Sequence, residues 1–415
     1  MTTKEILAGY SARSWRFLVD RQQFVMGKRE GSYFWNLEGD RRILDCGNGG
    51  GVHSLGHRNP EIIEALIEAL GHLDAGNWTM ATPEHLSLHD MLVASAPTPR
   101  LTRTVATLGS TESIDLALMF ASRVTGRRKA LAYRHGFHGH SGLAALVTGS
   151  DPEGMMKHYS LPTNYGEFFG EYGSVESVDG FINDDCAAVI LEPMNYETFE
   201  PARTDFLPRL AEVCRSRGTL LIVDETRTGL GRSGLLYMSS HYRFEPDMIV
   251  LGKGFGGGIY PVSALLTTQG IYDSCMNQSA WGYQSSLAGS PIAAVVAAKV
   301  LEIVQRRAVS ENVVQLERAL TAGFHDLRER YPDVFAGAWV LGGIAGLAFS
   351  DETAALTVKS ELFKRNVMCH SVSVIKPRCV KFFPCLTSDA AVVGEITQAL
   401  ADFAAEHRRG RRPGG

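Results

Sequence analysis

The stretch from residue 220 to residue 261 decides the fold. It reads LLIVDETRTGLGRSG (220–234) and, after a short connection, PDMIVLGKGFGGGIYP (246–261). One apolar run ends in Asp224, and the next ends just before Lys253 and a run of glycines. Runs that are apolar at every position are typical of strands buried on both faces of a parallel sheet. Ligands of such sheets bind at the carboxyl ends of the strands, so Asp224 and Lys253 are candidates for one shared site.

The flanking sequence repeats the same strand–turn–helix pattern. Amphipathic segments that end near glycines indicate helices between the apolar runs. The expected fold class is therefore α/β with a mostly parallel sheet, followed after about residue 309 by helices and mixed strands of a second, small domain. The expected strands are TRTVATLG (102–109), KALAYR (129–134), CAAVILEP (186–193) and VSALLTT (262–268), and the expected helices include ESIDLALMFASRVTG (112–126) and FLPRLAEVCRSRG (206–218).

Composition excludes several classes of protein. The 415 residues are 45% hydrophobic and 21% charged, which is typical of a globular chain and not of a disordered or fibrous one. The net charge of −4 gives no reason to expect a nucleic-acid partner. Seven scattered cysteines without a CxxC pair favour reduced thiols in a cytosolic enzyme. We see no secretory signal and no 18-residue apolar run, so a cytoplasmic protein without a membrane span is expected.

The segment GSTES (109–113) is a candidate anion site. Gly109 follows a predicted strand, and Ser110 and Thr111 open a predicted helix. Free backbone N–H groups at a helix N-terminus, with two hydroxyl groups beside them, can bind a phosphate. The simpler alternative is that the serine or threonine only caps the helix, which is the common use of these residues.

Asp224 and Lys253 each allow two interpretations. A buried carboxylate needs a cationic or hydrogen-bonding partner, which is either a structural arginine or a protonated ring nitrogen. A lysine at a strand end either extends its amine to the surface or keeps a desolvated amine with a lowered pKa for covalent chemistry. The glycines at 254 and 256–258 would let the backbone approach a bulky bound group.

A third candidate is the histidine-rich turn RHGFHGHSG (134–142). His135, His138 and His140 have a spacing that a metal site could use, but no other segment supplies matching ligands. Phe137 with His138 over a flat ligand suits the turn better. A phosphate cradle, an aromatic turn, a strand-end acid and a strand-end lysine, in this order, fit the cofactor pyridoxal phosphate (PLP).

At this point the chain resembles the class III (ornithine/ω-amino type) PLP-dependent aminotransferases over most of its length. The most specific match is DETRTGLGRSG…PDMIVLGKG. Further matching stretches are GSYFWNLEGDRRILD (31–45), LGHRNPEIIEA (55–65), GSTESIDLALMFASRVTGRRK (109–129), FHGHSG (137–142), AAVILEPMNYE (187–197) and YQSSLAGSPIAA (283–294).

The resemblance implies a fold and an assembly. It implies fold type I, with a seven-stranded, mostly parallel sheet in the large domain and a small α+β domain built from both chain ends. The expected divisions are 1–65 (N-terminal part of the small domain), 66–309 (PLP-binding domain), 310–407 (small domain) and 408–415 (disordered tail). It also implies a homodimer with active sites at the interface and small-molecule amines and carbonyl compounds as substrates.

The resemblance also implies roles for individual residues. Lys253 becomes the lysine that bonds to the cofactor aldehyde and then moves a proton as general base and acid, and Asp224 becomes the partner of the pyridine nitrogen. The other implied cofactor residues are Gly109, Ser110 and Thr111 at the phosphate, Phe137 and His138 at the ring, Thr226 and Arg227 beside it, and Ser286 from the neighbouring subunit. Glu192 and Glu197 are implied to line the same pocket.

Four positions depart from the family pattern. Thr226 replaces a valine, and Arg227 replaces a glutamine. His140 and Lys381 stand where carboxylate-binding members carry arginine. Since lysine does not reproduce a bidentate arginine clamp, we expect a substrate without an α-amino-acid carboxylate at that end.

An amine-bearing polyhydroxylated molecule fits these departures, such as an amino sugar or aminoglycoside of an antibiotic pathway, and a diamine or other ω-amine fits nearly as well. Alternatively, Arg227 binds a carboxylate and the substrate is an ordinary amino acid. An aminomutase or epimerase would use the same residues without net transfer. Two further alternatives are a noncatalytic domain on this fold and a metal hydrolase built on the histidine turn.

Overall fold

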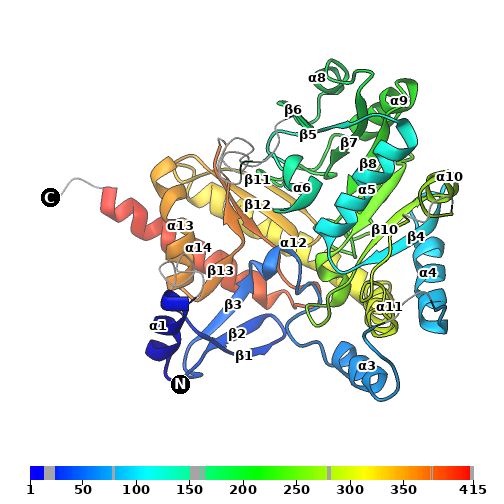
Figure 1. Ribbon diagram of the computed structural model, residues 1–415. Coiled ribbons are helices and arrows are strands. Elements are labelled where there is room, and N and C mark those ends of the chain that lie inside the picture. Colours follow the sequence, from blue (N-terminus) through cyan, green and yellow to red (C-terminus); the bar gives the residue numbers. More distant parts are fainter. Residues whose placement is uncertain are drawn as a thin grey trace.

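The computed structural model describes residues 1–13, 24–76, 80–149, 160, 164–277, 282–373, 375 and 377–411. Its larger part is built on a seven-stranded sheet with the order β4-β10-β9-β8-β7-β5-β6 (Figure 1). Neighbouring strands are parallel except at β10, which runs antiparallel to both β4 and β9. The expected mostly parallel sheet is confirmed. The strands are β4 (Leu101–Thr107), β5 (Lys129–Tyr133), β6 (Gly166–Phe169), β7 (Cys186–Leu191), β8 (Leu220–Asp224), β9 (Met248–Leu251) and β10 (Ser263–Thr268).

The central strands are buried on both faces, as their unbroken apolar sequence predicts. Along β8, Leu221 and Val223 pack into one core, and Ile222 between them packs into the core on the opposite face. Helix α5 contributes to the second core, and α4, α9 and α11 contribute to the first. The helices of this part are α3 (Pro60–Leu70), α4 (Pro83–Ser95), α5 (Ser110–Thr125), α6 (Gly142–Leu146), α8 (Val175–Asp179), α9 (Phe206–Ser216), α10 (Gln269–Tyr272) and α11 (Pro291–Val304).

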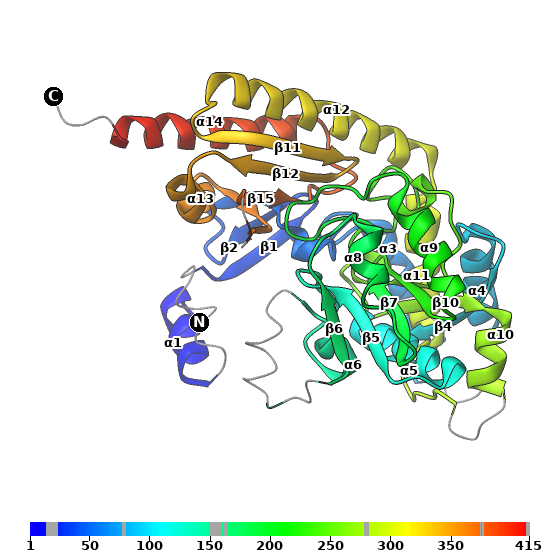
Figure 2. The same ribbon diagram turned by 90° about the horizontal axis from the view of Figure 1, so that it is seen from above.

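The smaller part combines both ends of the chain. The antiparallel strands β2 and β3 form a hairpin, and β3 pairs in parallel with β13, so that Leu44 lies opposite Val367. A second sheet has the order β11-β12-β15-β14, and Figure 2 shows α12 and α14 beside β11 and β12. These elements are α1 (Thr3–Arg13), β1 (Met26–Glu30), β2 (Tyr33–Asn36), β3 (Arg42–Cys46), α12 (Arg307–Arg330), β11 (Phe335–Leu341), β12 (Ile344–Phe349), α13 (Glu352–Lys364), β13 (Val367–Cys369), β14 (Ser371–Val372), β15 (Cys379–Phe382) and α14 (Ala391–Arg411).

Two boundaries differ from the expectation. The division at 309–310 falls in the first turn of α12, which begins at Arg307 and runs into the smaller part. The tail was expected to lose structure from residue 408, but α14 continues to Arg411 because Arg408 is ion-paired with Asp333. Residues 412–415 lie outside the described part. Among the described helices, none is both long and apolar enough to cross a membrane.

Candidate active site

Asp224 ends β8 with its carboxylate fully buried and bonded at both oxygens. Its Oδ2 lies 2.7 Å from Nδ1 of His138, and its Oδ1 accepts the backbone N–H of Thr226 at 3.0 Å. Burial acts to raise the pKa of Asp224, but the hydrogen bond and charge of His138, with the N–H of Thr226, lower it overall. Asp224 is therefore an ionised carboxylate at the carboxyl end of a central strand.

Lys253 follows β9, the neighbour of β8, and is held in an unusual backbone conformation. Its φ of 48° lies in the left-handed region, which a side chain disfavours and which is frequent at functional sites. Burial lowers the pKa of the Lys253 amine to about 8, and Arg227 acts in the same direction, while Asp224 and Glu192 oppose the shift. About a tenth of this amine is therefore neutral, and hence nucleophilic, at pH 7, far more than for a lysine of ordinary pKa.

The N-terminus of α5 lies next to Lys253 and is open to an anion. Its cap residue is Gly109, and no side chain caps the first turn, so Ser110 and Thr111 are not simple caps here. A Cβ atom on Gly252 would lie 2.7 Å from the Cβ of Ser110, so the backbone before Lys253 touches the start of α5. A Cβ atom on Gly139 would lie 2.7 Å from Oγ1 of Thr111, which places the histidine-rich turn against the same helix end.

Arg227 forms a buried ion pair with Glu192 near the amine of Lys253. Its Nε lies 2.8 Å from Oε1 of Glu192, and its Nη2 contacts the same oxygen. The guanidinium carbon lies 3.7 Å from the ring centre of Tyr196 and 5.7 Å from that of Phe137. The backbone N–H of Phe137 donates to the other oxygen of Glu192 at 3.3 Å. Arg227 is thus engaged on its edge by a carboxylate and on its face by an aromatic ring.

Lys381 forms a second buried ion pair next to Tyr196. Its Nζ lies 3.7 Å from Oε2 of Glu197, donates to the carbonyl of Tyr196 at 3.0 Å and lies 4.2 Å from the Tyr196 ring centre. Burial lowers the pKa of Lys381 to about 8, with Glu197 opposing the shift and Arg227 adding to it. Arg227 and Lys381 are therefore both paired with carboxylates and both contact one aromatic ring.

The remaining predicted residues lie in different surroundings. Thr226 is buried next to Asp224, and His140 is exposed with its ring 4.9 Å from that of Phe137. Ser286 is exposed on the surface of the chain. The other two histidines of the turn have separate neighbours, since His138 is bonded to Asp224 and His135 packs against a tyrosine ring. No group of three or more potential metal ligands occurs within the described ranges.

The glycine run after Lys253 packs against protein. A Cβ atom on Gly257 would lie 2.4 Å from the side chain of Ile62, and one on Gly258 would lie 2.3 Å from the ring of His53. One on Gly254 would lie 2.8 Å from the carbonyl of Gly51. The expectation that these glycines admit a bound group is therefore wrong at these three positions, where they admit the N-terminal segment instead.

Sequence reasoning missed Gly50 and His370. Gly50 has a φ of 67° and lies next to Lys253. A Cβ atom on Gly50 would lie 3.7 Å from Nζ of Lys253 and 3.1 Å from Cε1 of His370. Burial, with Arg227, Lys381 and Lys253 nearby, holds the pKa of His370 well below its ordinary value. The run GNGGG (47–51) was a visible signal for Gly50, whereas no motif marks His370.

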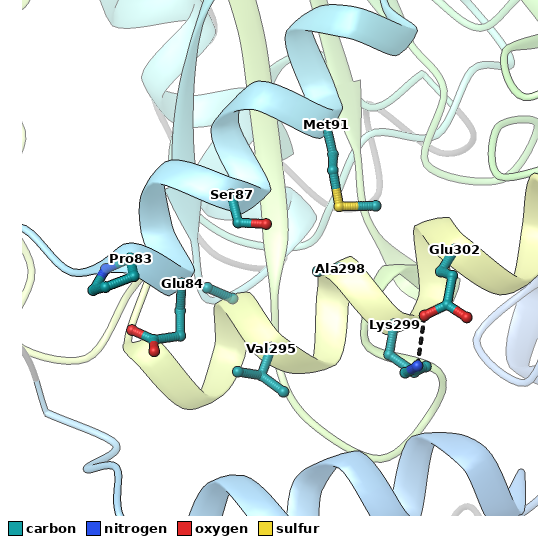
Figure 3. A pocket seen from close by; sticks show the side chains of 9 residues that line it. Pro83, Glu84, Ser87, Met91, Val295, Ala298, Lys299 and Glu302 are labelled. Carbon is teal, nitrogen blue, oxygen red and sulfur yellow. Dashed lines mark hydrogen bonds and ion pairs between the residues drawn. The ribbon is translucent and has the colours of Figure 1, made fainter.

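A cavity of about 450 Å³ lies elsewhere, between α4 and α11 (Figure 3). Met91 and Ala298 form part of its wall, and the ion pair of Lys299 and Glu302 lies at one end. None of its lining residues belongs to the cluster around Lys253, so it is separate from the candidate active site.

Comparison with known proteins decides the family. The family model described as aminotransferase class-III matches residues 18–403. The chain belongs to the class III aminotransferases. An uncharacterized aminotransferase of Archaeoglobus fulgidus is 37% identical over 309 residues, which cover 74% of this chain and 71% of that protein. An acetylornithine aminotransferase of Rhodobacter capsulatus is 31% identical over 78% of this chain and 81% of its own length. A putrescine aminotransferase of Pectobacterium atrosepticum is 28% identical over 85% of this chain and 78% of its own length.

Solved structures share the fold of this aminotransferase. The ornithine aminotransferase of Toxoplasma gondii superimposes with a TM-score of 0.86 at 21% identity, covering 99% of this chain and 97% of the other. An S-selective transaminase of Bacillus megaterium gives a TM-score of 0.87 at 18% identity, with 99% of each chain covered. At these identities the likeness establishes the fold type I architecture and no more.

Class III aminotransferases use PLP, and the described residues fit that cofactor. The open N-terminus of α5 suits a phosphate. The ionised, buried Asp224 suits a protonated ring nitrogen, and the Lys253 amine suits an aldehyde. All three groups lie at the carboxyl ends of β4, β8 and β9 or directly after them, where α/β sheets place their ligands.

Proposed function

We propose that this aminotransferase acts on an amine without an α-amino-acid carboxylate at the end bound beside Arg227 and Lys381. The preferred candidate is an amino sugar or aminoglycoside, aminated at a primary carbon in a biosynthetic pathway such as that of an antibiotic. The observation that carries this proposal is the pairing of both cations, Arg227 with Glu192 and Lys381 with Glu197. A substrate carboxylate would have to displace a buried carboxylate from its partner, whereas hydroxyl groups or an ammonium group can bind to the pairs as they stand.

The reaction is proposed to be ping-pong transamination. The donor amine becomes a carbonyl compound, and a carbonyl acceptor then receives the amino group. PLP, when bound, supplies the aldehyde that accepts nitrogen and a ring that delocalises negative charge. Lys253, neutral in part because its pKa is about 8, takes a proton from one carbon and returns it to another. Asp224, kept ionised by His138, stabilises the positive charge of a protonated ring nitrogen.

The other site residues are proposed to position the cofactor. Ser110 and Thr111, with the backbone N–H groups after Gly109, would bind its phosphate. Phe137 would lie against its ring, since the same residue contacts Glu192 through its backbone and lies near the Arg227 guanidinium. Thr226 is placed beside the ring by its backbone bond to Asp224. His140, which is exposed, would lie on the entry side of the pocket.

The active form is proposed to be a homodimer in which Ser286 contributes to the phosphate site of the partner. Ser286 is exposed on its own chain, and several apolar side chains of the chain are exposed as well. Ile67 and Leu70 on α3 are 65% and 59% exposed, although they share the apolar face on which Ile62 is buried, and Leu287 is 51% exposed. Exposed apolar surface of this kind is typical of an interface.

The cytoplasm is the proposed location. All seven cysteines are buried and free, as in proteins of a reducing compartment.

A diamine is the second candidate substrate, and the similarity to a putrescine aminotransferase favours it. The similarity to an acetylornithine aminotransferase leaves an amino acid bound by Arg227 as a third. An aminomutase or epimerase would use the same residues without net transfer, and product analysis with and without an external amino donor distinguishes it from a transaminase.

Substrate screening tests the proposal. The holoenzyme is assayed with amino sugars, diamines, 4-aminobutyrate and acetylornithine as donors against one common carbonyl acceptor. We expect amino sugars or diamines to give the highest kcat/KM. A much higher kcat/KM for acetylornithine or 4-aminobutyrate would contradict the substrate assignment and leave the family assignment intact.

A further inference from the structure

The ring of Tyr196 contacts both buried cations of the active site. The guanidinium carbon of Arg227 and the amine of Lys381 lie 3.7 Å and 4.2 Å from the centre of its ring. Its backbone carbonyl also accepts the Lys381 amine at 3.0 Å. The ring therefore occupies surface of both cations that would otherwise be available to a carboxylate.

Arg227 retains hydrogen-bonding capacity beneath this ring. Arginine has five N–H donors, and Glu192 engages the Nε and Nη2 atoms through one oxygen. Within the described part of the chain, Nη1 makes no hydrogen bond. A guanidinium with a free edge is a strong carboxylate receptor once it is accessible, so the pair with Glu192 makes carboxylate binding costly but leaves one edge of Arg227 that a second group has to cover.

The ring of Tyr196 is also placed to face a substrate. It is partly exposed, and its centre lies 5.9 Å from that of Phe137 at an interplanar angle of 31°. Phe137 contacts Glu192, and Tyr196 contacts Arg227. Glu192 and Arg227 both shift the pKa of the Lys253 amine, so they lie near the reacting amine. Tyr196 thus contacts both cations in the part of the site that adjoins the reacting amine.

We propose that Tyr196 is a specificity-determining residue that covers Arg227 and Lys381 and thereby excludes substrates that carry a carboxylate at this end. The inference rests on the proposed function, because it supplies the reason why an aminotransferase with two active-site cations prefers amines without that carboxylate. It predicts that removal of the ring creates a carboxylate site from groups already present, without any added cation.

The test compares two donors of equal length that differ only at one end, 4-aminobutyrate and 4-aminobutan-1-ol, with a common acceptor. In Tyr196→Ala the ratio of kcat/KM for the acid to that for the alcohol should rise about tenfold or more, the effect of one or two charge-assisted hydrogen bonds, mainly through a lower KM for the acid. Tyr196→Phe keeps the ring and should retain the wild-type ratio.

A double variant identifies the group that is uncovered. Tyr196→Ala combined with Arg227→Gln should lose the gain in the ratio, because the guanidinium edge is gone. An unchanged ratio in Tyr196→Ala, or a gain that persists in the double variant, would overturn the inference. If Tyr196→Ala is poorly folded, Tyr196→Leu, which keeps apolar bulk without a flat ring, takes its place with the same criterion. The wild-type screen tests the substrate class separately, so the two can fail independently.

Discussion

Nδ1 of His138 lies 2.7 Å from Oδ2 of Asp224, and both side chains are excluded from solvent. The two residues come from the turn after β5 and the end of β8, so the contact joins two separate loops of the site. A buried carboxylate without a partner is strongly unfavourable, and His138 supplies that partner on the protein side. The Nε2 atom of the His138 ring is buried without a hydrogen bond within the described structure, so the ring nitrogens of His138 bond to Asp224 alone among the described residues.

Replacing His138 should therefore destabilise the protein and also lower its catalytic rate. His138→Ala leaves Asp224 buried with only the N–H of Thr226, and loss of one partner of a buried pair costs about 3–5 kcal/mol. We expect a loss of this order in the free energy of unfolding of the cofactor-free protein, measured by denaturant titration. His140→Ala, at the exposed end of the same turn, is the control and should change stability by less than about 0.5 kcal/mol. Equal stability of the two variants would refute a role for this pair in the fold.

Asp224 and its neighbour Glu225 offer a matched pair of substitutions. Both carboxylates are buried, but Glu225 accepts the backbone N–H groups of Met238 and Ser239 and the hydroxyl of Thr228, so it holds a loop. Asp224→Asn should bind PLP but slow proton transfer by several orders of magnitude, because an amide cannot stabilise a protonated ring nitrogen. Glu225→Gln should lower the thermal midpoint with a much smaller effect on single-turnover rate. A normal single-turnover rate in Asp224→Asn would assign Asp224 another role.

Lys253→Ala tests the covalent and proton-transfer roles together. The variant should remain folded, because it removes a buried amine whose lowered pKa indicates a cost of burial, and alanine adds no atom to the backbone turn. Turnover should fall by a factor of about 10³ or more, since both nucleophile and base are removed. Sodium borohydride should fix no cofactor to the variant chain, in contrast to the wild type, as read by mass spectrometry. Lys364→Ala, an exposed lysine of α13, is the control. A near wild-type rate in Lys253→Ala would refute the assignment.

Some residues of the site can be placed from the sequence, and others cannot. Asp224 and Lys253 could be placed because each follows an unbroken apolar run, and adjacent parallel strands bring their carboxyl ends together. The partners of Arg227 could not be placed in the same way. Glu192 is 35 residues away along the chain, and the contact with Tyr196 depends on the path of an irregular loop.

The contacts between the two parts of the molecule were even less accessible to sequence reasoning. The approach of His370 to Gly50 depends on the parallel pairing of β3 with β13, strands that are more than 300 residues apart. The apolar pattern of α3 predicted a helix correctly, but it did not reveal that Ile67 and Leu70 remain exposed in the single chain. Periodicity identifies an apolar face, but it does not tell which part of that face the rest of the chain covers.

The pH dependence of stability should reveal the buried Lys253 amine in the cofactor-free protein. Its pKa is about 8 in the fold against an ordinary value of 10.5, so below pH 8 the native state carries the cost of a buried charge. Between these values the unfolded chain binds more protons than the native protein, so stability rises with pH. The free energy of unfolding of wild type minus that of Lys253→Met should increase by up to about 3 kcal/mol from about pH 7.5 to about pH 10.5. A difference that stays flat or falls would show that the amine is not desolvated.

The last prediction concerns the shared site and uses subunit mixing. If Ser286 serves the partner's phosphate site, one dimer contains two sites, each with Lys253 from one chain and Ser286 from the other. Ser286→Asp places a negative charge where a phosphate would bind and should reduce PLP affinity strongly. Lys253→Ala abolishes the chemistry of its own chain. Each homodimer should therefore be nearly inactive.

Mixing the two variants under conditions that exchange subunits distinguishes shared from separate sites. In the heterodimer, a shared geometry pairs intact Lys253 of one chain with intact Ser286 of the other, which restores one complete site per dimer. Random exchange makes half of the dimers mixed, so about a quarter of the wild-type activity per site should return, provided that the two sites act independently. If Ser286 acted within its own chain, both sites of the heterodimer would stay defective and mixing would restore nothing. Light scattering on each variant verifies that both are dimers, because a monomeric variant would fail to complement for a reason unrelated to the site. An active monomeric wild type would contradict the shared site directly.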